Sequence, residues 1–268
     1  MDQKLKAKLK LVLTNSIKDF FLRKLQNGVS STNILDTLFP KERRIRSLIG
    51  GLETSMGTTV WEAIAKELAT NNGFEVITDK QFLMPNPFPK ELRDIIESLL
   101  HSRENGISLS TEHCIKEIRE VCKRIDCSGS NFVSPSSGNG IDVYLKKDGI
   151  EYVFDMKSAQ SNVGDFKRYA RQLLYWYGYR LCKDPQAELR ARIAFTFNPF
   201  SKSFYDVQRT KISTHLDPKY DIFVENEFWD FCSGIVNTSA TFHSLFEELR
   251  EEKFNEQFHN IFYENINN

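Results

Sequence analysis

Two short apolar runs joined by a turn constrain this chain more than any other segment. Residues 141–146 and 150–157 each have the composition of a β-strand, and the turn sequence Lys147-Asp148-Gly149 separates them. The segment therefore predicts a β-hairpin. The first run carries Asp142, and the second ends in the triplet Asp155-Met156-Lys157. A hairpin brings these charged residues to the same end of a small sheet.

Two carboxylates at close range repel each other unless a cation lies between them. Asp142 and Asp155 therefore predict a Mg²⁺ site, with the backbone carbonyl of Met156 as a further oxygen ligand. A bound Mg²⁺ would polarise a phosphate and lower the pKa of a water, and Lys157 would orient that water. The alternative is a surface hairpin with ordinary charges, because such a spacing also arises by chance.

The overall charge and the cysteines limit the classes of function. The chain of 268 residues has 36 basic and 36 acidic residues, which argues against indiscriminate electrostatic binding of nucleic acid but leaves a metal-dependent nuclease open. No run approaches the roughly 18–20 apolar residues of a membrane span, and the N-terminus lacks an apolar signal core. We therefore expect a cytoplasmic protein without a membrane partner, and its five cysteines are expected to be reduced thiols.

The sequence pattern divides the chain into three parts. A helical region at 1–56 precedes an α/β core at 57–197, which contains a long insertion at about 80–139, and an aromatic-rich region follows at 198–268. The core is expected to contain, in order, a helix from about 58, a strand at 74–78, the hairpin, a helix at about 165–182 and a strand at 191–197.

This order of elements resembles the core of the PD-(D/E)xK nucleases, with Asp142 on the second strand and Asp155-x-Lys157 on the third. Ile141 stands where the family's name has a proline. Within that superfamily, residues 138–142 (Gly-Asn-Gly-Ile-Asp) and 154–158 (Phe-Asp-Met-Lys-Ser) resemble the TdeIII-type type II restriction endonucleases. The resemblance implies an α/β fold: a mixed β-sheet flanked by helices, with helical extensions at both ends of the chain.

The same resemblance implies a type II restriction endonuclease that hydrolyses double-stranded DNA with Mg²⁺, with GGNCC as the expected site. A palindromic site implies a homodimer with one active site for each strand. A cognate DNA methyltransferase would protect the host DNA. Two alternatives stay open: a repair-associated or mobile-element nuclease with the same core, and a DNA-binding protein that has lost catalysis.

Glu62 is the expected further acid, because nucleases of this superfamily often place one on the helix before the first strand. It would bind a second metal ion or hold a metal-bound water. Glu67 competes with it for this role, and Glu53 is a more distant candidate.

Several polar residues after the lysine are candidates for DNA contacts. The helix at about 165–182 begins with basic side chains, and helix N-termini favour phosphate. The candidates are Gln160, Lys167, Arg168 and Arg171. A solvated basic face is an equally good interpretation. The aromatic run at 173–177 predicts core packing rather than a base-stacking platform, and base-reading residues are expected within 80–139 and 198–240.

Overall fold

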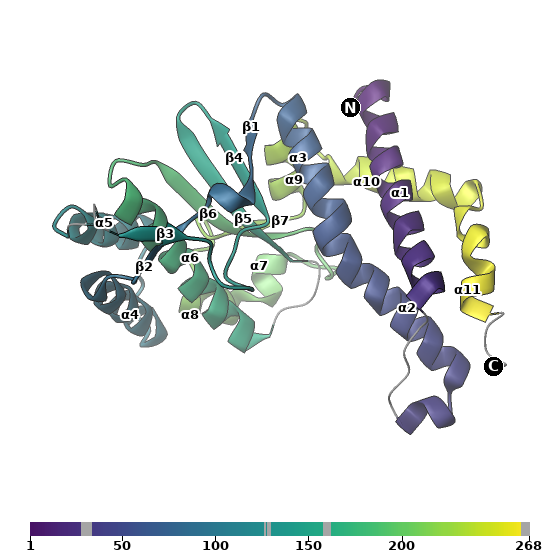
Figure 1. The fold of residues 1–268 in the computed structure, drawn as a ribbon, viewed down its shortest axis with the longest axis horizontal. Coiled ribbons are helices and arrows are strands. Elements are labelled where there is room, and N and C mark those ends of the chain that lie inside the picture. The colour runs from purple at the N-terminus through teal and green to yellow at the C-terminus, as the bar shows by residue number, and fades with distance from the viewer. Residues whose placement is uncertain (28–33, 126, 128–129, 158–161, 264–268) are drawn as a thin grey trace. The chain divides into compact units, whose positions relative to one another are not determined.

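The computed structural model describes residues 1–27, 34–125, 127, 130–157 and 162–263. The chain divides into two compact units (Figure 1). Unit 1 contains residues 1–68 and 229–268, so it combines both ends of the chain, and unit 2 contains residues 69–228.

Unit 1 is helical. Its elements, of which α3 and α9 continue across the boundary with unit 2, are α1 (Gln3–Asn27), η1 (Ile34–Thr37), α2 (Pro40–Met56), η2 (Gly57–Trp61), α3 (Glu62–Asn71), α9 (Asn226–Ser233), α10 (Ser239–Glu251), η4 (Phe254–Phe258) and α11 (His259–Tyr263). Helix α1 buries side chains at helical spacing, including Leu5, Leu9 and Leu13, because its lysines occupy the opposite face. In the described parts of the chain, no helix combines the length and the apolar composition that a membrane crossing requires.

Unit 2 is an α/β structure. Its elements are β1 (Glu75–Ile77), η3 (Asp79–Gln81), β2 (Met84–Asn86), α4 (Lys90–Glu104), α5 (Thr111–Cys122), β3 (Asn131–Val133), β4 (Val143–Lys147), β5 (Ile150–Lys157), α6 (Val163–Lys183), β6 (Leu189–Phe195), α7 (Phe204–Val207), α8 (Arg209–His215) and β7 (Ile222–Val224). Five strands form one sheet in the order β1-β4-β5-β6-β7, and β2 pairs separately with β3. Strands β1, β4 and β5 are antiparallel neighbours, whereas β5, β6 and β7 are parallel. The sheet is therefore mixed.

The predicted mixed sheet flanked by helices is confirmed. The hairpin of β4 and β5 closes with Lys147 opposite Ile150, and Asp148 and Gly149 between them both have positive φ, 52° and 79°. Two left-handed residues make the type I′ turn that matches strand twist, which is why Asp-Gly favours a hairpin. The sequence did not indicate β7 or the β2–β3 ribbon, because strands of three residues carry too little alternation. The PD-(D/E)xK assignment itself stays a prediction.

Helix α6 packs along one face of the sheet, against Val153 of β5 and Ile193 of β6 among others. Its buried side chains include Phe166, Tyr169, Ala170, Leu173, Leu174, Trp176 and Tyr177. Core packing of the aromatic run is confirmed, although Tyr175 is only half-buried. Helix α4 packs closely beside α6: a Cβ on Gly178 would lie 3.0 Å from Cδ1 of Ile96. This tight contact helps to position α6, whose Tyr169 ring lies 5.7 Å from the Lys157 ammonium at the end of β5.

The cysteines depart from expectation at one pair. Cys127, which follows α5, and Cys182, in the last turn of α6, form a disulfide with Cα atoms 6.3 Å apart. The prediction that all five cysteines are reduced is therefore wrong for this pair. The packing of α5 against α6 brings the two residues together across a separation of 55 residues, which the sequence does not indicate. The free cysteines Cys114, Cys122 and Cys232 are buried.

Candidate active site

The charged residues of the hairpin meet where β4 ends beside β5. The ladder between these strands ends with Val143 opposite Phe154, and β5 continues alone through Lys157. Asp142 immediately precedes β4, and both its N–H and its carboxylate bond to the backbone of β5, at Phe154 and Met156. The two predicted carboxylates therefore interact with each other where these strands end.

Asp142 makes hydrogen bonds to the backbone of β5 through both its side chain and its own backbone. Its Oδ2 accepts a hydrogen bond from the backbone N–H of Met156 at 2.7 Å, and its own N–H donates to the carbonyl of Phe154 at 2.8 Å. The N–H and C=O of one strand residue point to the same side of the strand. The carbonyl of Met156 therefore faces the side on which the Asp142 carboxylate lies.

Asp155 and Lys157 lie on one face of β5, because side chains two residues apart share a face. The Lys157 ammonium donates to Oδ1 of Asp155 at 2.6 Å, and it lies 5.7 Å from the ring centroid of Tyr169 on α6. The side chain of Asp155 is 8% exposed, whereas that of Lys157 is 28% exposed. The acid is thus buried while the lysine reaches solvent.

Burial raises the pKa of Asp155 to about 6, and the negative charge of Asp142 acts in the same direction against the opposing effect of Lys157. Within the described residues, Oδ2 of Asp155 is buried and has no hydrogen-bond partner. A buried carboxylate oxygen without a partner is costly, and a cation would relieve that cost. The site therefore has the electrostatics of a cation site.

The donor set also fits a divalent cation. Two carboxylates and one carbonyl are hard oxygen ligands of the kind that Mg²⁺ prefers. The described residues contain no group of three or more histidine, cysteine, aspartate or glutamate side chains suited to a metal. That is compatible with Mg²⁺, which commonly uses one or two carboxylates and completes its shell with waters and substrate phosphate.

Glu62 lies at the start of α3, in unit 1, whereas the other candidate residues belong to unit 2. It forms an ion pair with Lys66 one turn later, at 3.3 Å. Its competitor Glu67 pairs with Lys8 of α1 at 2.6 Å, so Glu67 helps to hold two helices of unit 1 together. The role of Glu62 in the site stays a prediction.

The first turn of α6 already carries its own negative charge. Asn162 and Asp165 form a capping box, in which Asn162 Oδ1 accepts from the Asp165 N–H and the Asp165 carboxylate accepts from the Asn162 N–H. A phosphate at this helix end would compete with Asp165. Gln160 lies outside the described residues.

The three basic candidates on α6 all have acidic partners. Lys167 pairs with Glu104 at 3.0 Å, and Arg171 makes a two-pronged contact with Glu97; both acids are on α4. Arg168 pairs with Asp165, three residues earlier on the same helix, at 3.0 Å. Their assignment to DNA contacts stays a prediction, and no sequence pattern indicated the α4 partners.

Two hydrogen bonds hold the segment that leads to Asp142. The sequence did not indicate either of them. The indole N–H of Trp176 donates to the carbonyl of Asn139 at 2.9 Å, and the Gln172 amide donates to the carbonyl of Gly140 at 3.4 Å. These partners are 37 and 32 residues apart in the chain. Such contacts to backbone atoms leave no pattern in a single sequence.

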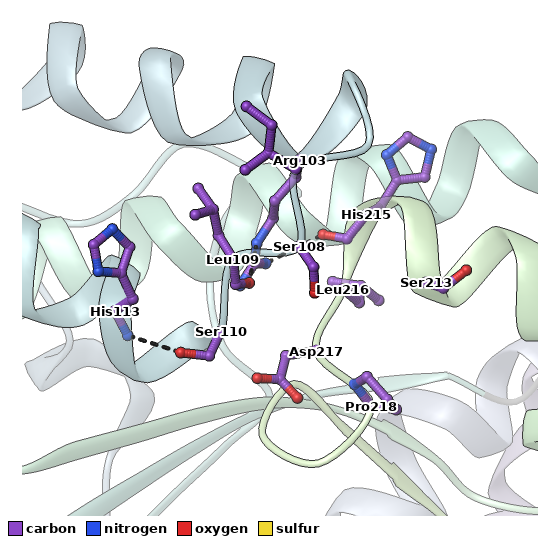
Figure 2. A pocket seen from close by; sticks show the side chains of 11 residues that line it. Arg103, Ser108, Leu109, Ser110, His113, Ser213, His215, Leu216, Asp217 and Pro218 are labelled. Atoms are coloured by element: carbon purple, nitrogen blue, oxygen red, sulfur yellow. Dashed lines mark hydrogen bonds between the residues drawn. The ribbon is translucent and has the colours of Figure 1, made fainter.

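A separate cavity of about 440 Å³ lies between the α4–α5 loop and the segment that joins α8 to β7 (Figure 2). Arg103 lies in its wall and donates to the carbonyls of Leu109 and His215, to Thr111 Oγ1 and to Asp221. Arg103 and Asp221 are only 5% and 1% exposed. The guanidinium therefore joins two loops and does not act as a free binding group.

Comparison with known proteins relates the chain to restriction enzymes. Residues 1–250 match the model of a family described as "Type II restriction endonuclease, HinfI". The chain is 25% identical over 222 residues to the type II restriction enzyme MjaII of Methanocaldococcus jannaschii, an alignment that covers 78% of this chain and 55% of MjaII. The chain thus spans about half the length of this curated relative. No solved structure matches the chain. The narrower resemblance to the TdeIII type is not confirmed by these matches.

Proposed function

The chain belongs to the HinfI family of type II restriction endonucleases, and on that premise we propose that it is a site-specific deoxyribonuclease that hydrolyses double-stranded DNA. The observation that carries the proposal is the buried Oδ2 of Asp155, which has no hydrogen-bond partner among the described residues, beside Asp142 and Lys157. An acid held this way has little structural value, but it is suited to binding a cation.

The proposed metal is Mg²⁺, held by the carboxylates of Asp142 and Asp155 and by the carbonyl of Met156, with Glu62 as the expected further acid. Mg²⁺ supplies polarisation of the scissile phosphate and a lowered pKa for a bound water. The partly exposed ammonium of Lys157 orients the attacking water and stabilises negative charge that develops on the phosphate. Oδ1 of Asp155 restrains that ammonium through its hydrogen bond.

The DNA contacts form part of the same proposal. Gln160, Lys167, Arg168 and Arg171 would contact the phosphate backbone, and the segments at 80–139 and 198–240 would read bases. The TdeIII resemblance suggests GGNCC as the site. A palindrome of this kind is cut by a two-fold symmetric homodimer, for which the region at 198–268 is the proposed interface or recognition element. A cognate methyltransferase and a cytoplasmic location complete the proposal.

Digestion of an unmethylated plasmid with and without Mg²⁺ tests the function. We expect discrete fragments that EDTA abolishes, and run-off sequencing of their ends gives the site. A smear or nicking at DNA structures would support a repair or mobile-element nuclease instead. No cleavage by the wild type with Mg²⁺ or Mn²⁺ would leave a DNA-binding protein as the better interpretation.

Substitution of the site residues tests the chemistry. Asp155→Ala and Lys157→Ala are each expected to abolish cleavage while DNA binding in a gel-shift assay persists. Asp79→Ala and Lys183→Ala are matched controls, because both residues are exposed and lie outside the segments at 80–139 and 198–240. Cleavage by either site variant at near the wild-type rate would show that the site is misassigned.

A further inference from the structure

A second, smaller cavity lies on the outer side of α6. Its volume is about 210 Å³, and its floor is aromatic, because Trp176 and Tyr179 are buried. Its rim is polar and consists of Arg168, Arg171, Gln172 and Asn139, with the half-buried ring of Tyr175 beside them. Sites for whole small molecules commonly measure about 300–1,000 Å³. This cavity is therefore sized for one part of a larger molecule.

The two arginines of the rim differ in their availability. Glu97 accepts from both ends of the Arg171 guanidinium and from the Tyr175 hydroxyl, so the charge of Arg171 is balanced within the protein. Arg168 is 64% exposed, and among the described residues its contacts are the surface pair with Asp165 three residues earlier and the ring of Tyr169, whose centroid lies 5.6 Å from the guanidinium carbon. Surface pairs of this kind are weak and are screened by salt. Arg168 is therefore the rim cation that an incoming anion can engage.

The cavity lies close to the proposed active site. Asn139 is three residues before Asp142, and a chain spans at most about 3.3–3.6 Å for each residue, so their Cα atoms are no more than about 11 Å apart. The DNA duplex rises about 3.4 Å per base pair. The rim of the cavity is thus within about three base-pair steps of the carboxylate-bearing residue. Gln172 and Trp176, which line the cavity, also hold the backbone at residues 139–140.

We propose that this cavity is a nucleotide subsite that takes one nucleotide of the DNA strand within about three positions of the cleaved phosphodiester. Arg168 contacts its phosphate, the amide of Gln172 contacts its polar edge, and the ring of Tyr175 packs against its apolar surface. A cation, an amide and an aromatic ring are the groups that proteins use for these three parts of a nucleotide. The inference rests on the proposed function and adds Gln172, Tyr175 and Asn139 to the residues that meet DNA.

The salt dependence of DNA binding tests the subsite. The protein is studied in an Asp155→Asn background with Mg²⁺, so that no strand is cut, on a duplex that carries the site mapped with the wild type. Each added or removed phosphate contact changes the slope of log K against log salt by about 0.9. Arg168→Gln should make this negative slope shallower by about 0.9. Gln172→Lys keeps a donor for the Gly140 carbonyl, adds a cation, and should steepen the slope by about the same amount.

Matched controls separate a subsite from a general effect of charge. Gln186→Lys adds the same charge beyond the far end of α6, about 16 Å or more along the helix from Gln172, which exceeds the Debye length of about 10 Å at 0.1 M salt. Lys183→Gln removes an exposed cation in the last turn of α6, about 22 Å along the helix from Arg168 and outside the proposed base-reading segments. Both controls should leave the slope unchanged.

The possible outcomes are distinct. A Gln172→Lys slope no steeper than that of Gln186→Lys would overturn the subsite, as would equal slopes for Arg168→Gln and Lys183→Gln. Should Gln172→Lys fail to fold, as judged by circular dichroism, the comparison of Arg168→Gln with Lys183→Gln decides alone. Absence of cleavage by the wild type would overturn the proposed function itself, whereas site-specific cleavage with unchanged slopes would overturn only the subsite.

Discussion

Asp155→Asn is expected to stabilise the metal-free protein while it abolishes cleavage. The substitution keeps the shape of the side chain but removes a negative charge that is buried beside Asp142. Lys157 offsets that charge only in part, because the pKa of Asp155 is still raised, from 3.8 to about 6. An acid of this kind is retained for function at a cost in stability.

The size and the sign of the effect follow from the pKa of Asp155. The folded protein holds this proton more tightly than the unfolded chain does, so stability falls as pH rises from about 4 to about 6. The pKa of Asp155 rises from 3.8 in the unfolded chain to about 6 in the folded protein. At 1.36 kcal/mol for each pH unit, the ionised carboxylate destabilises the folded state by about 3 kcal/mol at pH 8. Asparagine avoids this cost. At roughly 2–4 °C per kcal/mol for domains of 150–250 residues, Tm should rise by about 6–12 °C.

Thermal unfolding in EDTA at pH 8 and pH 4.5 measures this difference. We expect the variant to melt well above the wild type at pH 8 and close to it at pH 4.5. Mg²⁺ should then raise the Tm of the wild type more than that of the variant, because a ligand at 100 times its Kd stabilises by about 2.7 kcal/mol. Asp94→Asn, at an exposed position of α4, is the control and should change little.

A variant that melts at or below the wild-type temperature at pH 8 would refute the reasoning. So would a difference in Tm that is the same at both pH values, because the effect would then not depend on ionisation of Asp155.

Two further predictions concern stability. Asp221→Asn removes the charge that pairs with the buried Arg103, so the free energy of unfolding in urea should fall by about 3–5 kcal/mol, and a loss below about 1 kcal/mol would contradict the importance of this pair. Cys127→Ser removes the disulfide to Cys182, which joins residues 55 positions apart. It should lower the free energy of unfolding by about 2–4 kcal/mol under oxidising conditions. In dithiothreitol the variant and the wild type should become similar, and a variant that is weaker by the same amount in both conditions would point to lost packing instead.

Local sequence features predicted much of unit 2. The Asp148-Gly149 turn fixed the hairpin, since few other pairs accept two positive φ values in succession. Apolar spacing located α6 within two residues at its start and one at its end, because its core-facing side chains repeat at helical intervals. The three-residue strand β7 escaped notice, because its pairing with β6 depends on a partner far along the chain.

The candidate site divides in the same way. The positions of Asp142, Asp155 and Lys157 at one end of a hairpin follow from the sequence alone, because a tight turn sets the register and alternation sets the face. Tertiary packing decided that Asp155 is buried, that its Oδ2 has no partner among the residues that the structure describes, and that Lys157 stays partly exposed.

The sequence by itself thus determined which chemical groups share one end of the sheet. Tertiary structure decided their environment: the ion pairs of Lys167 and Arg171 with α4, the Cys127–Cys182 link, and the hold of α6 on residues 139–140. The physical reason is the separation along the chain over which each effect acts. Turn and strand preferences act over a few neighbouring residues, whereas desolvation, ion pairing and clamping depend on which distant surfaces pack together.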